Sequence, residues 1–280
     1  MKISVFYDHV QKACAARGLT MPVMLRYLRE WQIDGVYMGL NTLLKDEAYI
    51  LHELQNAGLS VCGMYNTFHW SNGFDEGEAK TFVDTAVRCR AGNILIVPGF
   101  LPKEQADILR SLTDETDIAA FMEQNETIKN IRAGLQYTVD YAASKGIVVT
   151  LEDYDGYAAP FSRTAELKWW MEHVPGLQFT LDTGNFAFSD EDALAACTVF
   201  RKNIVHVHCK DRAADPSVQS GVYDHGLLPC AVGDGYLPMA EIISCLKENG
   251  YTGGLTIEHF GTEDFFETIR RSAVFLNSIK

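Results

Sequence analysis

The sequence of 280 residues predicts an α/β protein, a single (β/α)8 barrel domain that spans residues 1–280. Short β-branched runs alternate with longer amphipathic segments eight times, which is the number of repeats in such a barrel. Three of the helical segments are followed by a glycine directly before a strand, as short helix-to-strand loops require. The length fits one barrel, because α/β barrels occupy about 200 to 300 residues. A doubly wound open sheet is the alternative.

Eight segments are predicted to be strands because each is a short run rich in β-branched residues. In chain order they cover residues 3–7, 35–39, 60–65, 93–98, 146–152, 177–182, 204–208 and 254–258.

Eight amphipathic segments are predicted to be helices, at residues 20–31, 44–57, 78–89, 118–144, 164–173, 190–200, 238–248 and 263–279. Gly58, Gly146 and Gly250 each follow one of these segments and precede a strand. We expect these three glycines to adopt the left-handed backbone conformation that ends a helix.

One long irregular stretch, residues 209–236, separates the seventh strand from its helix. Loops of this length in a compact domain are more often functional than not. The active site of a barrel lies at the carboxyl ends of its strands, where this stretch begins. The sequence therefore predicts an active-site loop or lid at 209–236.

The charge of the chain excludes two classes of partner. Lys and Arg number 24 and Asp and Glu number 37, so the formal net charge is 24 − 37 = −13. This charge repels nucleic-acid phosphates and anionic lipid surfaces. We expect neither nucleic acid nor a membrane as a partner.

The cysteines and the N-terminus favour a cytoplasmic location. The first residues run directly into a strand, without an apolar leader segment. The seven cysteines are scattered and form no CxxC motif, which favours reduced thiols over a disulfide framework. The assembly is left open, with a homodimer or a homotetramer as candidates.

The last four predicted strands each end on a side chain that can bind a metal, namely Glu152, Asp182, His208 and Glu258. Side chains alternate between the two faces of a strand, so these four residues share a face with Thr150, Thr180, His206 and Thr256. The other face is apolar and suits packing against helices. The polar face must therefore point into the barrel.

Burying three carboxylates and an imidazole together is costly unless they bind a cation. Most of their ligand atoms are carboxylate oxygens, which are hard ligands that suit Mn²⁺ or Mg²⁺ and can also bind Zn²⁺ or Co²⁺. A single solvated carboxylate at a strand end would need no such explanation. Four such residues in consecutive strands with the same parity predict one divalent-metal site.

The motifs around these residues resemble those of the xylose isomerase-like TIM-barrel superfamily, in particular its sugar phosphate isomerase/epimerase branch. The motifs are Leu151-Glu152, Leu181-Asp182-Thr183-Gly184-Asn185, His206-Val207-His208-Cys209-Lys210-Asp211, Gly233-Asp234-Gly235 and Thr256-Ile257-Glu258. The resemblance spans the chain and is sharpest after Gly146. It implies that Glu152, Asp182, His208 and Glu258 hold the metal, and that Glu152 and Glu258 also transfer protons.

The resemblance implies a metal-dependent isomerase or epimerase acting on a small polyhydroxy carbonyl compound, a sugar or sugar phosphate. Such a reaction needs a base, an acid and an electrophile beside the carbonyl, and two glutamates and a divalent ion supply these. Epimerases of this branch usually have a histidine where this chain has Asn185. Two alternatives stay open: a dehydratase of an inosose-like keto-polyol on the same metal platform, and a non-catalytic sugar-binding barrel.

Three further residues are candidates for substrate binding. Asn185 can hydrogen-bond a hydroxyl. His69 follows the third strand beside Phe68 and Trp70, and Lys210 follows the histidine pair, where a cation can hold a substrate oxygen. An ion pair of Lys210 with Asp211 is the alternative, and Asp211 is also a candidate to orient His208.

Overall fold

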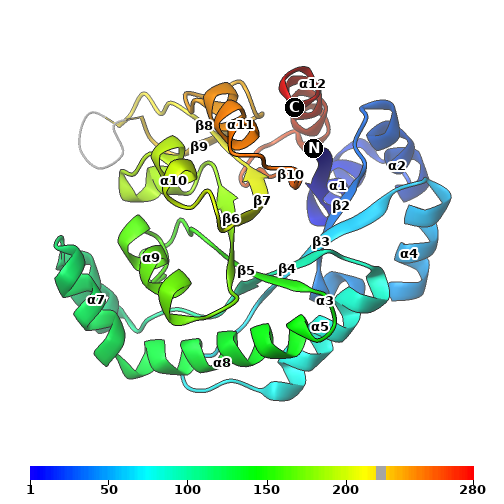
Figure 1. Cartoon of the computed structure of the whole chain (residues 1–280). Coiled ribbons are helices and arrows are strands. Elements are labelled where there is room, and N and C mark those ends of the chain that lie inside the picture. The colour runs from blue at the N-terminus through cyan, green and yellow to red at the C-terminus, as the bar shows by residue number, and fades with distance from the viewer. Residues whose placement is uncertain (219–224) are drawn as a thin grey trace.

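Eight parallel strands form a closed barrel, which confirms the predicted fold class. The computed structural model describes residues 1–218 and 225–280, and within them the barrel order is β1-β10-β7-β6-β5-β4-β3-β2. Figure 1 shows the helices arranged outside these strands. The barrel strands are β1 (Lys2–Phe6), β2 (Gly35–Gly39), β3 (Ser60–Thr67), β4 (Asn93–Val97), β5 (Val148–Glu152), β6 (Gln178–Asp182), β7 (Ile204–Cys209) and β10 (Gly254–Ile257).

The helices are α1 (Tyr7–Arg17), α2 (Met21–Glu30), α3 (Leu40–Leu43), α4 (Glu47–Asn56), α5 (Glu76–Cys89), α6 (Lys103–Ser111), α7 (Glu115–Gln124), α8 (Glu126–Ala143), α9 (Thr164–His173), α10 (Ala193–Val199), α11 (Met239–Glu248) and α12 (Phe265–Ile279), with a short 3-10 helix at Phe186–Ser189. In the described part of the chain, none of them has the length and apolar character needed to span a bilayer.

Helices α1, α3 and α6 were not predicted, and the predicted helix at 118–144 is divided in two. Helix α1 was not predicted, because its buried face includes the polar His9 and the small Ala13 rather than a stripe of large aliphatic side chains. The predicted helix at 118–144 is two helices, α7 and α8, which meet at Asn125. The backbone of Asn125 is extended, and its side chain accepts a hydrogen bond from the backbone N–H of Ile128 at 3.1 Å. Asn125 is therefore an N-cap, which a periodicity argument does not detect.

The three predicted glycine caps are confirmed. Gly58, Gly146 and Gly250 have φ values of 68°, 72° and 77°, in the left-handed region where only glycine is free of a steric penalty.

A buried polar layer fills the barrel beneath the strand ends. The Thr180 hydroxyl donates to the Thr150 hydroxyl at 2.8 Å, and Thr256 lies 2.6 Å from His206 Nε2. Tyr37 from β2 stacks on the His206 ring, with 4.8 Å between the ring centroids. The strand parity predicted from the sequence is therefore correct, and His206 is a hydrogen-bonded core residue.

The stretch predicted to be an irregular lid contains regular structure at both ends. Strands β8 (Asp211–Ala213) and β9 (Leu228–Cys230) pair as an antiparallel hairpin next to the barrel. Residues 219–224, in the middle of the predicted lid, lie outside the described residues. The closing motion of this segment over a substrate stays a prediction.

Gly134 in α8 sits against Trp70, and we expect Gly134→Ala to lower the free energy of unfolding by about 1–3 kcal/mol, the usual cost of overpacking. An added Cβ would lie 2.6 Å from a Trp70 ring atom and 3.0 Å from Phe74 Cβ. At an unobstructed site within a helix the same change would stabilise by about 1 kcal/mol. Urea unfolding measures the difference.

Gly92→Ala is the matched control for Gly134→Ala. Among the described residues, none lies within 4 Å of a Cβ built at Gly92, and its φ is not positive. We expect a change within about 0.5 kcal/mol for this surface site. Equal stability of the two variants would show that α8 can shift away from Trp70 at no cost.

Candidate metal and active site

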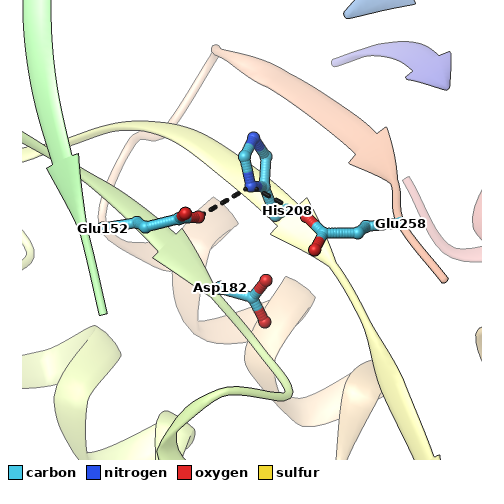
Figure 2. A group of neighbouring side chains, drawn as sticks. All are labelled: Glu152, Asp182, His208 and Glu258. Carbon is cyan, nitrogen blue, oxygen red and sulfur yellow. Dashed lines mark hydrogen bonds and ion pairs between the residues drawn. The ribbon is translucent and has the colours of Figure 1, made fainter. Parts of the chain in front are cut away.

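The four residues predicted as metal ligands converge at the carboxyl ends of the strands. Glu152, Asp182, His208 and Glu258 are all buried, and each offers one ligand atom within 4.8 Å of the others. Figure 2 shows the side chains of Glu152 and Glu258 approaching His208 from opposite sides, with Asp182 below. The alternation of side chains along the strands thus identified residues that lie close together in space. Their role in metal binding stays a prediction.

Strand register places these residues side by side. Asp182 is the partner of His208 in the β6–β7 ladder, and Thr256 is the partner of His208 in the β10–β7 ladder. Glu258 directly follows β10, and its backbone N–H donates to the Cys209 carbonyl at 3.1 Å. The hydrogen bonding between β10 and β7 therefore continues past the last residue of β10 and fixes the position of Glu258 along the barrel axis.

The Asp182 carboxylate is oriented by the turn after β6. Its Oδ1 accepts hydrogen bonds from the backbone N–H groups of Gly184 at 2.8 Å and Asn185 at 3.0 Å. The backbone N–H of Asp182 itself donates to the buried Asp153 carboxylate at 2.8 Å. Asp182 Oδ2 is thereby directed into the cluster.

His208 presents Nδ1 to two carboxylates. Nδ1 lies 3.1 Å from Glu152 Oε2 and 3.0 Å from Glu258 Oε2. The rings of Phe6 and Tyr37 pack edge-on against the imidazole, at centroid distances of 5.0 and 4.8 Å. Within the described residues, His208 Nε2 is buried without a hydrogen bond, so the carboxylates at Nδ1 and the aromatic packing together set the orientation of the ring.

The expected contact between Asp211 and His208 is wrong. The Asp211 carboxylate accepts hydrogen bonds from the backbone N–H groups of Arg212, Gly233, Gly235 and Leu237. Asp211 therefore ties the end of β7 to the turn that leads into α11. A single sequence gives no signal for this, because the four donors become neighbours only in the folded chain.

The donor set fits a divalent cation. Asp182 Oδ2 lies 3.0 Å from Lys210 Nζ, and Glu258 Oε2 lies 3.0 Å from His208 Nδ1. Among the described residues, neither of these buried oxygens makes a hydrogen bond of good geometry. Buried oxygens in this state are rare and costly unless an ion or water also binds them. Three carboxylates and one imidazole nitrogen match the ligands that Mn²⁺ and Mg²⁺ accept, and Zn²⁺ and Co²⁺ also bind such sets.

Burial and mutual charge shift the pKa values within the cluster in opposite directions. Burial raises the pKa of Glu152 and of Asp182. Burial acts on Glu258 as well, but the positive charges of Lys210 and His208 outweigh it and hold its pKa below the usual value. Three buried carboxyl groups therefore face only the positive charges of Lys210 and His208. A bound cation would add positive charge and so stabilise their ionised forms.

Lys210 lies inside the cluster and not beside Asp211. Its Nζ is 2.7 Å from Glu258 Oε1 and 3.0 Å from Asp182 Oδ2, and it donates to Asn185 Oδ1 at 2.8 Å. The predicted substrate residues Lys210 and Asn185 are thus brought together at the site, and their contact with a substrate stays a prediction.

A cavity of about 280 Å³ opens directly above the carboxylates. Lys210 and Asn185 line it, together with residues that were not predicted from the sequence, namely Phe6, Tyr65, Thr67, Leu95, Val97, Tyr154, Asp155 and Phe260. Asp155 is held by the buried Arg212, whose Nη2 lies 2.6 Å from Asp155 Oδ2. The acidic run Glu152-Asp153-Tyr154-Asp155 at the end of β5 is the sequence signal for Tyr154 and Asp155.

His69 does not lie in this cavity. Its exposed side chain lines a neighbouring cavity of about 880 Å³, and Thr67 lines both. Phe68 and Trp70 stack on each other at 4.4 Å between ring centroids and are buried under the second cavity. The role of His69 in substrate binding stays a prediction.

Replacing Lys210 by Met is expected to destabilise the metal-free protein by about 3–5 kcal/mol, because it leaves buried carboxylates without their positive partner. Both Asp182 and Glu258 lose an ion pair in this variant. Urea unfolding after extensive chelation measures the effect.

The exposed pair Lys145–Asp84, 2.9 Å apart, provides the control. Lys145→Met is expected to change stability far less, because solvent screens this pair. Similar losses in the two variants would contradict the central electrostatic role of Lys210.

Comparison with known proteins gives a family match over most of the chain. The model described as xylose isomerase-like TIM barrel matches residues 6–279. Among curated proteins, the rhizopine catabolism protein MocC of Rhizobium meliloti is 38% identical over 92 residues, which cover 30% of this chain and 27% of that protein. This chain thus matches only about a quarter of the length of that relative.

Two further proteins match along most of the chain. Inosose dehydratase of Serratia proteamaculans (strain 568) is 23% identical over 227 residues, covering 76% of this chain and 74% of that protein. The structure of D-allulose 3-epimerase from Methylomonas sp. in complex with D-allulose has a TM-score of 0.72 at 16% identity, covering 100% of this chain and 97% of that chain. At this identity the structural likeness is one of fold.

Proposed function

Because the chain belongs to the xylose isomerase-like TIM-barrel family, we propose that it is a divalent-metal-dependent isomerase or epimerase of a small polyhydroxy carbonyl compound. The observation that carries the proposal is the pair of buried glutamates, Glu152 and Glu258, on opposite sides of His208 beneath a cavity of about 280 Å³. Binding alone does not need two carboxylates arranged in this way.

In the proposed mechanism, Glu152, Asp182, His208 and Glu258 would hold one divalent ion, Mn²⁺ or Mg²⁺ in the first instance. When bound, such an ion would supply a Lewis acid for a substrate carbonyl. Asp182 and His208 act only as ligands, since backbone hydrogen bonds and aromatic packing already fix their orientations.

The two glutamates move the protons. One carboxylate removes a proton from the carbon beside the carbonyl, and the other returns a proton from the opposite face. Return of a proton to the same carbon from the opposite face gives epimerisation. Return of a proton to the carbonyl carbon, with the hydroxyl proton of the first carbon passing to the former carbonyl oxygen, gives aldose–ketose isomerisation.

Lys210 and Asn185 hold a substrate hydroxyl in this scheme, because their polar atoms meet at the cavity wall. Aromatic residues on the wall, among them Phe6, Tyr65 and Phe260, exclude water around the reacting carbon.

A dehydratase is the second candidate. The match to inosose dehydratase over 76% of this chain favours it, and the same glutamates can remove a proton and assist the departure of a β-hydroxyl.

The test incubates Mn²⁺-loaded protein in deuterated water with a panel of ketoses and keto-cyclitols. Deuterium incorporation into a product formed without loss of water from the substrate supports the isomerase or epimerase. Loss of water with a new ultraviolet absorbance from an unsaturated carbonyl supports the dehydratase. Ligand binding without solvent exchange and without new product would contradict both and favour a binding barrel.

A further inference from the structure

The large cavity beside the active-site cavity is part of the same face of the barrel. It measures about 880 Å³ against about 280 Å³ for the active-site cavity, and Thr67 at the end of β3 lines both. Ligand pockets for small molecules usually measure about 300–1,000 Å³. The active-site cavity alone is therefore small, and the neighbouring one has room for a second ring. We call the larger cavity the Thr67 groove.

The polar lining of the Thr67 groove is suited to hydroxyl groups. Asn41 donates to Asn66 Oδ1 at 3.3 Å, which leaves the Asn41 carbonyl oxygen and the Asn66 amino group available for further hydrogen bonds. Thr67 and His69 add a hydroxyl and an imidazole, both on exposed side chains. Phe74 supplies a partly exposed aromatic surface nearby.

The charge of the groove opposes a phosphate. In the described part of the chain its only charged lining residues are Asp75 and Glu78, and no Lys or Arg lines it. The N-terminus of α5 borders the groove, and helix N-termini often bind anions. Here the Asp75 carboxylate already accepts from the backbone N–H groups of Gly77 at 2.6 Å and Glu78 at 3.2 Å.

The cations near the active-site cavity are also engaged. Lys210 is paired with Asp182 and Glu258. Arg212 is paired with Asp155 and donates to the carbonyl oxygens of Gly184 and Leu227. A phosphoryl group is normally held by the positive charge of Arg or Lys. Among the described residues that line the two cavities, the only such side chain is Lys210, whose charge is already balanced by two carboxylates.

From these observations we propose that the Thr67 groove is a second substrate subsite that binds a neutral sugar ring, so that the substrate is an unphosphorylated sugar carrying a glycosyl substituent. This inference rests on the proposed function for the reacting ring in the smaller cavity. The amide, hydroxyl and imidazole groups of the groove hydrogen-bond the second ring, and the acidic residues at its edge exclude phosphate esters.

The test measures equilibrium binding of unreactive polyols to the Mn²⁺-loaded protein by isothermal titration calorimetry. Glucitol represents the small ring site, glucitol 6-phosphate adds a phosphate, and maltitol, isomaltitol and lactitol add a sugar ring through different linkages. At least one of the three glycosyl glucitols is expected to bind about tenfold or more tightly than glucitol, from one or two added hydrogen bonds. Glucitol 6-phosphate is expected to bind more weakly than glucitol.

Two variants assign the effect to the groove. In the double variant Asn41→Ala/Asn66→Ala, the ratio of the glucitol Kd to the Kd of the best glycosyl glucitol is expected to fall toward one. Asn56→Ala removes an exposed amide that bonds His52 on α4, outside both cavities, and is expected to keep the ratio.

Tighter binding of glucitol 6-phosphate than of glucitol would overturn the inference, as would equal binding of glucitol and all three glycosyl glucitols. These polyols are not turned over, so their Kd values do not depend on the reaction. Tighter binding of a glycosyl glucitol, combined with no exchange of solvent deuterium into any ketose, would support the subsite and contradict the proposed function.

Discussion

Replacing Glu152 or Glu258 by Gln is expected to lower turnover by about 100-fold or more, the usual size of a general acid–base contribution. Glutamine keeps the shape of the side chain and one oxygen that can bind a metal, but it cannot accept a proton at that position. The two carboxylates approach His208 from opposite sides, so each is expected to serve one face of a bound substrate.

Isotope exchange separates the two glutamates. If the reaction is a two-base epimerisation, each Gln variant is expected to exchange solvent deuterium into the one epimer whose proton faces the remaining glutamate. Neither variant is expected to interconvert the two epimers. Proton nuclear magnetic resonance in deuterated water measures both quantities in one experiment.

The exposed Glu248 on α11 provides a matched control, because it bonds only to Ser244 among the described residues. Glu248→Gln is expected to keep full turnover. If Glu152→Gln or Glu258→Gln also turned over normally with metal occupancy verified, the protons would travel through another group, and Lys210 would be the next residue to test.

Removal of the metal is expected to abolish turnover completely, with recovery on addition of Mn²⁺, Co²⁺ or Mg²⁺. Asp182→Ala and His208→Ala are each expected to lower metal affinity by more than about 100-fold, since loss of even an outer partner of a metal ligand costs about 10- to 100-fold. Both residues contribute atoms to the group within 4.8 Å. Calorimetric titration of the chelated protein with Mn²⁺ measures the affinity.

His52→Ala is the control for the histidine variant, because His52 is an exposed residue of α4 that bonds to Asn56. Its metal affinity is expected to equal that of the unchanged protein. Full turnover by protein shown to be free of metal would refute the metal requirement, whatever the behaviour of the variants.

The sequence predicted the barrel and the convergence of its four strand-end residues because both follow from local rules. Strand parity alone directs Glu152, Asp182 and His208 inward, and parallel strands bring their carboxyl ends to the same rim. No contact between distant residues has to be known for this step. The strand count and the left-handed glycines such as Gly58 were predicted for the same reason.

Predictions were incomplete or stayed open where the answer depends on tertiary contacts. Lys210 could pair with its neighbour Asp211 or reach into the cluster, and only the folded chain shows Asp211 occupied by four backbone donors. His69 was placed from its position after β3, but the direction of its side chain depends on how the β3–α5 loop packs. The split between α7 and α8 depends on one capping residue, Asn125, within a continuous apolar pattern.

The closure of the barrel has a consequence for the order in which the protein matures. Strand β1 pairs with β10, and the hydroxyls of Ser4 and Thr256, 252 positions apart, lie 2.7 Å from each other. Contacts this distant in sequence carry a large loop-closure entropy and form late in folding. Glu258 follows the closing strand, so we expect it to be the last of the four strand-end residues to reach its place. If these four residues bind a metal, a chain that has not yet closed would offer an incomplete ligand set, and metal capture would mark the completion of folding.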